Sequence, residues 1–240
     1  MFYETNTRSI AKAVSWRILA TLVTTSLVWA FTHQLGLAAS IGGLEAIAKI
    51  FLFYAHERAW GRVNVGKRSV QPAVIWFTGL SGAGKTTLAR RVHEELTKRG
   101  WRAESLDGDA IRNVFPMTGF TRADRHAHVC RVGYLASRLE SHGIFSIAAL
   151  ISPYAESRTF VRGLCKNFLE IHLSTPLSEC ERRDVKGLYA KARSGQIKGF
   201  TGIDDPYEPP TNPELTIDTS TTTEEQACAK IVDLVVSRSR

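Results

Sequence analysis

Cysteine is scarce in this sequence. The 240 residues include only Cys130, Cys165, Cys180 and Cys228. They are widely spaced and form no C-x-x-C pair, so the sequence predicts neither a disulfide framework nor a zinc knuckle, and it is typical of a reducing cytosol. Compositional bias is also lacking: 44% hydrophobic and 22% charged residues exclude a disordered, collagen-like or low-complexity chain. The length fits one medium-sized domain, or one domain with a small attachment.

Most of the chain has little excess of positive charge. The overall net charge is +8, from 31 basic and 23 acidic residues. Residues 1–70 hold eight of the basic residues and only three glutamates, which leaves 23 basic and 20 acidic residues for the remainder. A surface that follows a nucleic-acid backbone needs a denser basic excess. The composition therefore argues against nucleic acid as a partner.

Two apolar segments lie within the basic N-terminal region. The first, residues 13–31, reads AVSWRILATLVTTSLVWAF and carries one charged residue, Arg17. A helix of roughly 20 such residues is long enough to cross a hydrocarbon core. The second, residues 37–54, includes Glu45 and Lys49, whose spacing places both on one helix face. With residues 33–36 as the turn, the pair predicts a two-helix transmembrane hairpin within residues 1–63.

Basic residues flank the hairpin at both ends, namely Arg8, Lys12, Arg17, Arg58, Arg62, Lys67 and Arg68. The positive-inside rule then predicts a multi-pass protein of the inner membrane with both termini in the cytoplasm. Two other interpretations compete. The first segment also has the generic pattern of a signal peptide. Alternatively, both segments are core helices, because Glu45 and Lys49 are costly within lipid. Residues 8–63 also resemble a small bacterial membrane domain of uncharacterised role, a two-helix unit found alone or fused to other proteins.

A phosphate-binding motif follows a short linker at residues 64–72. The apolar run AVIWFT (73–78) predicts a buried strand and leads directly into GLSGAGKT, a G-x-x-x-x-G-K-[ST] sequence that opens a helix. We call these eight residues the phosphate loop. Together with Thr87, its members are the predicted ATP-binding residues: Gly79, Leu80, Ser81, Gly82, Ala83, Gly84, Lys85, Thr86 and Thr87. Backbone amides and the helix N-terminus would hold phosphate oxygens, Lys85 would reach the β- and γ-phosphates, and Thr86 would ligate Mg²⁺.

Strand-like and helix-like runs alternate after the phosphate loop. Helices are expected at 86–99, 123–141 and 156–165, and strands at 103–106, 144–151, 168–173 and 215–218, followed by a final helix. Thr221 and Glu224 have the spacing of a capping box for that helix. Such alternation predicts a parallel sheet covered by helices on both faces, an α/β fold of the P-loop NTPase type, over residues 73–240.

Ligands of parallel sheets bind at the carboxyl ends of the strands. The second expected strand is followed by Asp107 and Asp109, and the third by Ser152. Carboxylates beside a phosphate loop would serve magnesium through water or orient an attacking hydroxyl. In the competing interpretation, one carboxylate or Ser152 only caps a helix or shapes a turn.

Residues 74–219 strongly resemble the adenylyl-sulfate kinase (APS kinase) family. The resemblance rests on WFTGLSGAGKTTLA, LDGD with Arg112, GFTRADR, ISPY with Arg158, and above all KGLYAKARSGQIKGFTGIDDPYEPP at 186–210. It implies an enzyme that uses ATP and Mg²⁺ to phosphorylate the ribose 3′-hydroxyl of adenosine 5′-phosphosulfate, which makes 3′-phosphoadenylyl sulfate in sulfate activation. It also implies a homodimer.

The resemblance assigns roles to individual residues. Asp107 would serve the magnesium shell through water, and Asp109 would orient the acceptor hydroxyl. Arg112 and Arg125 would hold the phosphosulfate, Phe120 and Phe200 would sandwich the adenine, and Lys186 and Lys198 would lie on a mobile lid. Ser152 matches a serine that the family assigns as a phosphoserine intermediate, although in-line transfer would leave it a positioning role. The catalytic residues would therefore be Lys85, Asp107, Asp109 and Ser152.

Departures from the family pattern lie on the acceptor side. Ala110 and His128 replace asparagines, Ala127 a glutamate, Cys130 an arginine and Val185 a proline, and the segment between Arg112 and Phe120 is one residue short. The departures, with His128 as a possible acceptor contact, motivate a second hypothesis: a P-loop kinase for another nucleotide-linked anhydride. A third hypothesis is a catalytically inactive nucleotide sensor coupled to the membrane hairpin.

Overall fold

The structure is a computed structural model, in which the chain forms two compact units, Met1–Val70 and Gln71–Arg240. It describes residues 2–4, 6–31, 38–63, 67–115 and 119–239. The predicted turn at residues 33–36 therefore lies outside the described residues, as does the side chain of Glu45.

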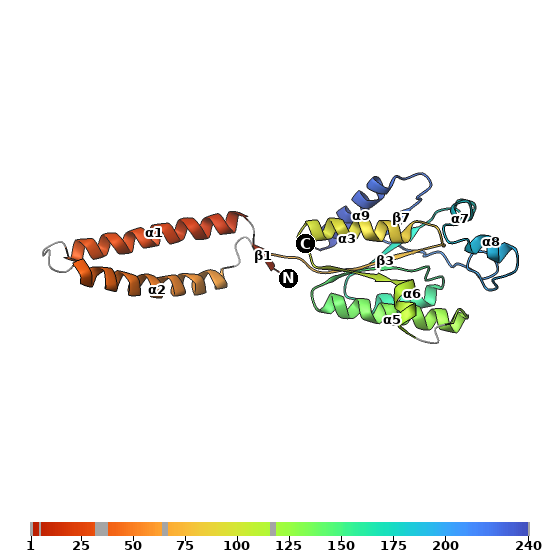
Figure 1. Ribbon diagram of the computed structural model, residues 1–240, viewed down its shortest axis with the longest axis horizontal. Helices are drawn as coiled ribbons and strands as arrows, with labels where there is room; N and C mark the ends of the chain where they lie inside the picture. Colours follow the sequence, from red (N-terminus) through yellow and green to blue (C-terminus); the bar gives the residue numbers. More distant parts are fainter. Residues whose placement is uncertain (1, 5, 32–37, 64–66, 116–118, 240) are drawn as a thin grey trace. The chain divides into compact units, whose positions relative to one another are not determined.

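The N-terminal unit consists mainly of two long helices, α1 (Asn6–Phe31) and α2 (Ala38–Arg62) (Figure 1). They run antiparallel, because Lys12 near the start of α1 forms an ion pair of 3.5 Å with Glu57 near the end of α2. Large apolar side chains on both helices are exposed, among them Ile10, Val14, Ile18, Phe51 and Phe53. No helix within the described part of the chain combines the length and the apolar character that a membrane crossing requires.

The predicted linker at residues 64–72 includes a short strand. Lys67–Ser69 forms strand β2, which pairs antiparallel with strand β1 (Phe2–Glu4). Each strand of this ribbon is three residues long, which is too short to show an alternating pattern, and Lys67–Ser69 is polar throughout. The ribbon closes the N-terminal unit, and the chain leaves that unit after Val70.

The second unit is an α/β fold around a five-stranded sheet. Its strands are β3 (Val74–Gly79), β4 (Ala103–Asp107), β5 (Phe145–Ala149), β6 (Phe168–Leu173) and β7 (Leu215–Ile217). They lie in the order β4-β5-β3-β6-β7, and every neighbouring pair is parallel. All six residues of β3 are buried, as expected for the central strand of a sheet covered on both sides. The predicted parallel sheet is confirmed.

Helices cover both faces of this sheet, with α3 and α9 on one side and α5 and α6 on the other (Figure 1). The helices of the unit are α3 (Lys85–Lys98), α4 (Gly108–Val114), α5 (Arg122–Ser141), α6 (Ala155–Leu164), α7 (Leu177–Arg183), α8 (Leu188–Arg193) and α9 (Glu224–Arg238). Under α5 the core includes Trp76, Val132, Ala136 and Val161, each completely buried. The short helices α4, α7 and α8 carry no periodic apolar pattern and were not predicted.

The predicted capping box of the last helix is wrong by two residues. Helix α9 begins at Glu224, and the Thr223 hydroxyl accepts the amide of Gln226 while the Gln226 side chain accepts the amide of Thr223. The Thr221 hydroxyl instead donates to the Asp218 carbonyl at 3.4 Å. Both pairs fit the same sequence spacing, and only the position of the first helical residue distinguishes them.

Candidate active site at the carboxyl edge of the sheet

The phosphate loop connects the central strand β3 to helix α3. At Gly79 the backbone has φ 149°, and a Cβ atom there would lie 2.7 Å from the carbonyl oxygen of Leu173 on the neighbouring strand. Gly84, directly before α3, has φ 92°. Only glycine combines these backbone angles with the close approach at Gly79. The loop therefore turns sharply enough to point the N-terminus of α3 at a bound anion.

The Lys85 side chain folds back over the phosphate loop. Its Nζ donates to the carbonyl oxygens of Gly79 at 3.0 Å and Leu80 at 2.7 Å. Burial lowers the pKa of Lys85 to about 8. An ammonium group held only by neutral carbonyls gains much from an anionic partner, so phosphate oxygens would compete well for it. Thr86 and Thr87 are exposed in the first turn of α3.

Asp107 and Asp109 follow strand β4 and differ in their surroundings. One oxygen of Asp107 accepts the amides of Asp109 and Ala110, each at 2.9 Å, and so caps helix α4. The capping interpretation thus holds for Asp107, whose second oxygen has no hydrogen bond among the described residues. Asp109 has a side chain that is 71% exposed, and it forms an ion pair with Lys186. Of the two, Asp109 is the carboxylate that a second substrate can reach.

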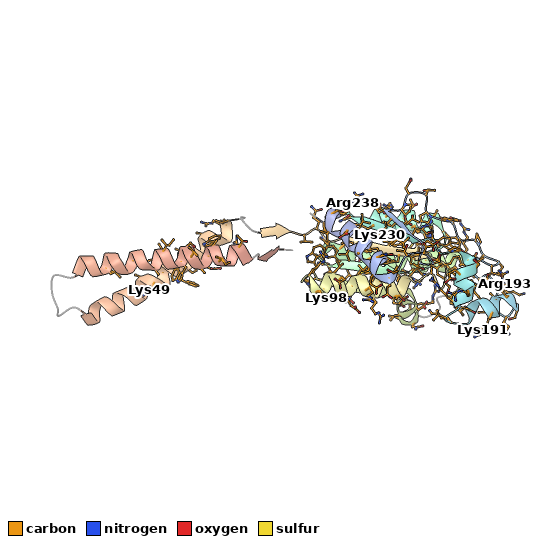
Figure 2. All side chains as sticks on the ribbon, turned by 90° about the horizontal axis from the view of Figure 1, so that it is seen from above. Lys49, Lys98, Lys191, Arg193, Lys230 and Arg238 are labelled. Atoms are coloured by element: carbon orange, nitrogen blue, oxygen red, sulfur yellow. The ribbon has the colours of Figure 1, made fainter. Side chains whose placement is uncertain are left out.

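Lys186 belongs to residues 184–205, which we call the lid segment. This segment contains α8, whose Lys191 and Arg193 lie at the end of the unit away from Lys98, the last residue of α3 (Figure 2). Because α3 starts at the phosphate loop, that end is the carboxyl edge of the sheet. The lid segment also contains Lys198, which is exposed.

The two predicted adenine-binding rings differ in exposure. Phe120, just before α5, is 67% exposed, and the Arg112 guanidinium lies 4.6 Å from its ring centroid. Phe200 in the lid segment is 8% exposed and packs edge-to-face on Tyr189 at 5.0 Å. Arg125 bonds to the backbone of Phe120 and to the lid segment next to Phe200, so the structure brings the two loops together.

Ser152 is buried and 2% exposed, at the carboxyl end of β5. Its Oγ accepts a hydrogen bond of 3.1 Å from the indole N–H of Trp76 in the central strand. Its backbone has φ 40°, which is uncommon for a residue other than glycine. The hydroxyl is therefore part of the core behind the site in this structure.

His128 also lies behind the site. It is 3% exposed, and its Nε2 bonds to the carbonyl oxygen of Gly108 at 3.0 Å. Since a carbonyl only accepts, Nε2 carries the proton and the buried Nδ1 is left without a partner among the described residues. Burial lowers the pKa of His128 and favours this neutral form. His128 therefore touches the site at Gly108, which lies between Asp107 and Asp109.

Comparison with known proteins identifies the family of the second unit. The family "Adenylylsulphate kinase" matches residues 71–218. The adenylyl-sulfate kinase of Rippkaea orientalis is 48% identical over 162 residues, which cover 67% of this chain and 90% of that protein. This chain belongs to the adenylylsulphate kinase family.

Solved adenylylsulphate kinase structures share the fold. The APS kinase of Mycobacterium tuberculosis, solved in complex with AMPPNP and APS, is 41% identical with a TM-score of 0.66 over 70% of this chain and 99% of that one. A hexameric APS kinase from Thiobacillus denitrificans is 32% identical with a TM-score of 0.54, over 70% of this chain and 29% of that one. Residues 10–61 of the N-terminal unit match a different family, "Predicted membrane protein (DUF2061)".

Three side chains of this adenylylsulphate kinase domain support the phosphate loop and were missed from the sequence. The Tyr189 hydroxyl donates to the Ser81 carbonyl at 3.0 Å, Arg183 donates to the Gly82 carbonyl at 3.3 Å, and the Thr219 hydroxyl donates to the Ala83 carbonyl at 3.1 Å. Arg183 also donates to the hydroxyl and the carbonyl of Thr219. Of the three, only Tyr189 belongs to a motif on which the family resemblance rests, residues 186–210. Nothing in the sequence showed that its hydroxyl would donate to the Ser81 carbonyl.

Proposed function

We propose that this protein transfers the γ-phosphoryl group of ATP to the 3′-hydroxyl of adenosine 5′-phosphosulfate and so produces 3′-phosphoadenylyl sulfate. The observation that carries the proposal is the arrangement at the carboxyl edge of the sheet. Lys85 lies in the phosphate loop after β3, and the exposed carboxylate of Asp109 follows β4 and pairs with Lys186. Family membership and the named activity of the curated relatives support the same reaction.

The donor half of the reaction falls to the phosphate loop. Its backbone and the N-terminus of α3 bind the phosphates, and the Lys85 ammonium moves from the loop carbonyls to the transferring group. There it balances charge that develops between the β- and γ-phosphates. Tyr189, Arg183 and Thr219 hold loop carbonyls, which keeps the loop in shape before ATP arrives.

The acceptor half falls to Asp109. Its carboxylate accepts the hydrogen of the 3′-hydroxyl, which orients the oxygen for in-line attack and takes the proton as the new bond forms. Lys186 pairs with Asp109, so it adds positive charge next to the carboxylate that receives the acceptor. The rings of Phe120 and Phe200 bind adenine, and Arg112 binds the phosphosulfate. Lys198 from the lid segment adds to the positive charge around the acceptor.

The side chains present fit a magnesium ion held mostly by the phosphates of ATP. Thr86 offers an exposed hydroxyl, and Asp107 has one carboxylate oxygen beyond its capping bonds. The described residues contain no cluster of three or more histidine, cysteine or acidic side chains that could hold a metal alone. Magnesium typically takes only one or two protein oxygens beside phosphates and water. Thr86 directly and Asp107 through water would hold the ion, which would neutralise phosphate charge.

Two of the departures from the family pattern do not favour another acceptor. His128 is buried and bonds to Gly108 behind the site. The Cys130 thiol lies 3.5 Å from His126 on the same helix, and His126 bonds to Ser157 at 2.9 Å. Because these side chains face helix packing, we place adenosine 5′-phosphosulfate ahead of other nucleotide-linked anhydrides.

An ADP-release assay with purified protein, ATP and a panel of acceptors tests this function. We expect turnover with adenosine 5′-phosphosulfate and a kcat/KM at least tenfold above that for any other nucleotide anhydride, a factor that corresponds to about 1.4 kcal/mol. Faster turnover of another anhydride would select the second hypothesis. ATP binding without turnover of any acceptor would select the nucleotide sensor.

We further propose that the N-terminal unit is a hairpin in the inner membrane, with both termini and the kinase unit in the cytoplasm. The family match of residues 10–61, the exposed apolar side chains of α1 and α2 and the flanking basic residues support this. Membranes washed with high salt and carbonate should retain the full-length protein, and its release would contradict a spanning hairpin. A homodimer, proposed from the family resemblance, is tested by light scattering of the detergent-solubilised protein.

A further inference from the structure

Tyr189 in the lid segment touches both halves of the site. It lies in the first turn of α8 and is 2% exposed. Its hydroxyl donates to the Ser81 carbonyl in the phosphate loop at 3.0 Å. Its ring packs edge-to-face on Phe200, with the two ring centroids 5.0 Å apart. One side chain therefore joins the phosphate loop to a ring that we expect to stack on the acceptor base.

The hydrogen bond to Ser81 sets the orientation of one peptide unit in the phosphate loop. The Ser81 carbonyl and the Gly82 N–H belong to the same planar trans peptide, so they point in opposite directions. Phosphate loops hold anions with N–H groups of this kind. Burial raises the pKa of the Tyr189 phenol, so the hydroxyl stays protonated and remains a donor at neutral pH. Tyr189 therefore helps to determine where a loop N–H points.

The lid segment around Phe200 also packs against the phosphate loop. Asp184 accepts the amides of Tyr189 and the residue after it, each at 3.0 Å, which fixes the start of α8. Two residues after Phe200, a Cβ atom at Gly202 would lie 3.0 Å from a methyl carbon of Leu80. The lid segment near Phe200 therefore has little room to move independently of the phosphate loop.

We propose that Tyr189 is a positioning residue that couples the two substrate sites, so that an occupied phosphate loop holds Phe200 in place for the acceptor base. Bound phosphates restrain the peptide that the hydroxyl holds, and the restraint passes through the ring to Phe200. The second substrate then loses less conformational entropy on binding than the first. Because the coupling is a free energy, the acceptor should tighten ATP binding by the same factor. This inference deepens the proposed function and rests on it for the identity of the acceptor.

A purely structural role for Tyr189 predicts a different result. The loss of its hydrogen bond would then lower the stability of the fold and leave the influence of one substrate on the other unchanged. Tyr189→Phe is the informative change, because phenylalanine keeps the ring beside Phe200 and removes only the hydroxyl that reaches Ser81.

Tyr207→Phe is the matched control. The Tyr207 hydroxyl bonds to Thr78 at 3.0 Å, in β3 directly before the phosphate loop. Its ring stacks on His172 instead of Phe200, with the centroids 6.0 Å apart. This variant therefore loses a comparable hydrogen bond near the loop without a link to the acceptor ring.

Hydrogen exchange with the ATP analogue AMPPNP tests the coupling without any acceptor. In the full-length wild-type protein, AMPPNP should slow exchange of the amides in 199–205 by about fivefold or more, the lower end of typical coupling between sites. In Tyr189→Phe it should slow them less than about twofold, and Tyr207→Phe should keep the wild-type response. No slowing in the wild type, or equal slowing in Tyr189→Phe, would overturn the proposal.

Titration calorimetry measures the same coupling with both substrates present. The Kd of AMPPNP is compared with and without saturating adenosine 5′-phosphosulfate, and in the wild type the acceptor should lower it by about fivefold or more. Tyr189→Phe should reduce this ratio by at least about twofold, the lower end for one neutral hydrogen bond. A ratio near one in the wild type, an unchanged ratio in Tyr189→Phe, or an equal loss in Tyr207→Phe would overturn the proposal.

Two further measurements keep the outcomes distinct. Thermal denaturation shows whether each variant is folded at the temperature of the assay. A wild-type protein that binds AMPPNP but neither binds nor phosphorylates adenosine 5′-phosphosulfate would refute the proposed function. The hydrogen-exchange result with AMPPNP alone would then decide the role of Tyr189.

Discussion

Replacement of Ser152 by alanine distinguishes direct phosphoryl transfer from a phosphoserine intermediate. The structure also predicts how much stability this replacement costs. The indole N–H of Trp76 donates to Ser152 Oγ at 3.1 Å, and both side chains are buried. Alanine would leave this donor unpaired in the core, which costs about 1–3 kcal/mol. For a chain of this length each kcal/mol lowers the melting temperature by roughly 2–4 °C. We therefore expect a folded variant with a clearly lower melting temperature.

Turnover of this variant should change little. The hydroxyl is held in the core by Trp76, and Asp109 is exposed to orient the acceptor, so direct transfer needs no phosphoserine. The loss of kcat should stay below the roughly 100-fold minimum that is typical of removing a group from proton transfer. A required phosphoserine predicts that turnover collapses and that radiolabelled phosphate from ATP is trapped on Ser152. Stoichiometric labelling of Ser152 at a rate compatible with turnover would refute direct transfer.

Thermal denaturation measures the stability of each variant, and the ADP-release assay, run below the melting temperature, measures its turnover. In a Trp76→Phe background the donor is absent, so Ser152→Ala should cost less than it does alone. Ser152→Gly loses the same hydrogen bond, but glycine tolerates the φ of 40° at this position. That conformation costs other residues about 1–2 kcal/mol, so Ser152→Gly should be less destabilising than Ser152→Ala. Ser141→Ala, which removes an exposed hydroxyl, is the matched control. An unchanged melting temperature for Ser152→Ala would show that the Trp76 bond contributes nothing.

Two further predictions concern Lys85 in the phosphate loop, and a third concerns the N-terminal unit. Lys85→Ala should lower kcat by on the order of 10² to 10³ while the melting temperature stays near that of the wild type, and near-normal kcat would contradict the role of the phosphate loop. Burial lowers the pKa of Lys85 to about 8, so at pH 8 the Lys85 side chain is neutral in roughly half of the protein molecules. Bound phosphates favour its ammonium form. ATP binding should therefore take up close to half a proton at pH 8 and almost none at pH 6, as measured by titration calorimetry in buffers of different ionisation enthalpy. Lys85→Arg should abolish this uptake, and uptake that persists in the variant would assign it to another group. Deletion of residues 1–70 should leave a soluble kinase of similar kcat, because the core of the second unit begins at Ala73. An insoluble or inactive product would show that the kinase unit needs the N-terminal unit.

The regular part of the fold could be predicted because its signals are local. Strand β6 was predicted at its observed bounds, and the other strands of the sheet within one or two residues. For β3 and β5 the signal was a short run that is buried at every residue. The phosphate loop could be located because its signal is a motif of eight consecutive residues between a strand and a helix. The short helices α4, α7 and α8 were missed because six or seven residues make fewer than two helical turns, too few to show a periodic apolar pattern. The β1–β2 ribbon was missed because its two strands are only three residues long and lie outside the buried sheet.

The partners of the site residues could not be predicted, because they are distant along the chain. Asp109 meets Lys186, Trp76 meets Ser152, and Arg125 meets Gly199. The sequence indicated which residues carry the chemistry, and only the fold determines which of them touch. Family resemblance did not supply these contacts either, since it assigns roles toward ligands and not contacts between side chains of the protein.

His128 shows how helical spacing could have corrected an interpretation based on resemblance. The resemblance placed it at the acceptor because an asparagine usually stands there. The buried residues of α5 begin with His128 and continue with Val129, Val132, Gly133 and Ala136, the spacing of one helix face. A residue on that face packs against the core, and the contact of His128 nearest to the site is its hydrogen bond to the Gly108 carbonyl. Because Gly108 directly precedes Asp109, a substitution at His128 should act on the orientation of the catalytic carboxylate, and hence on kcat, more than on the affinity for the acceptor tail.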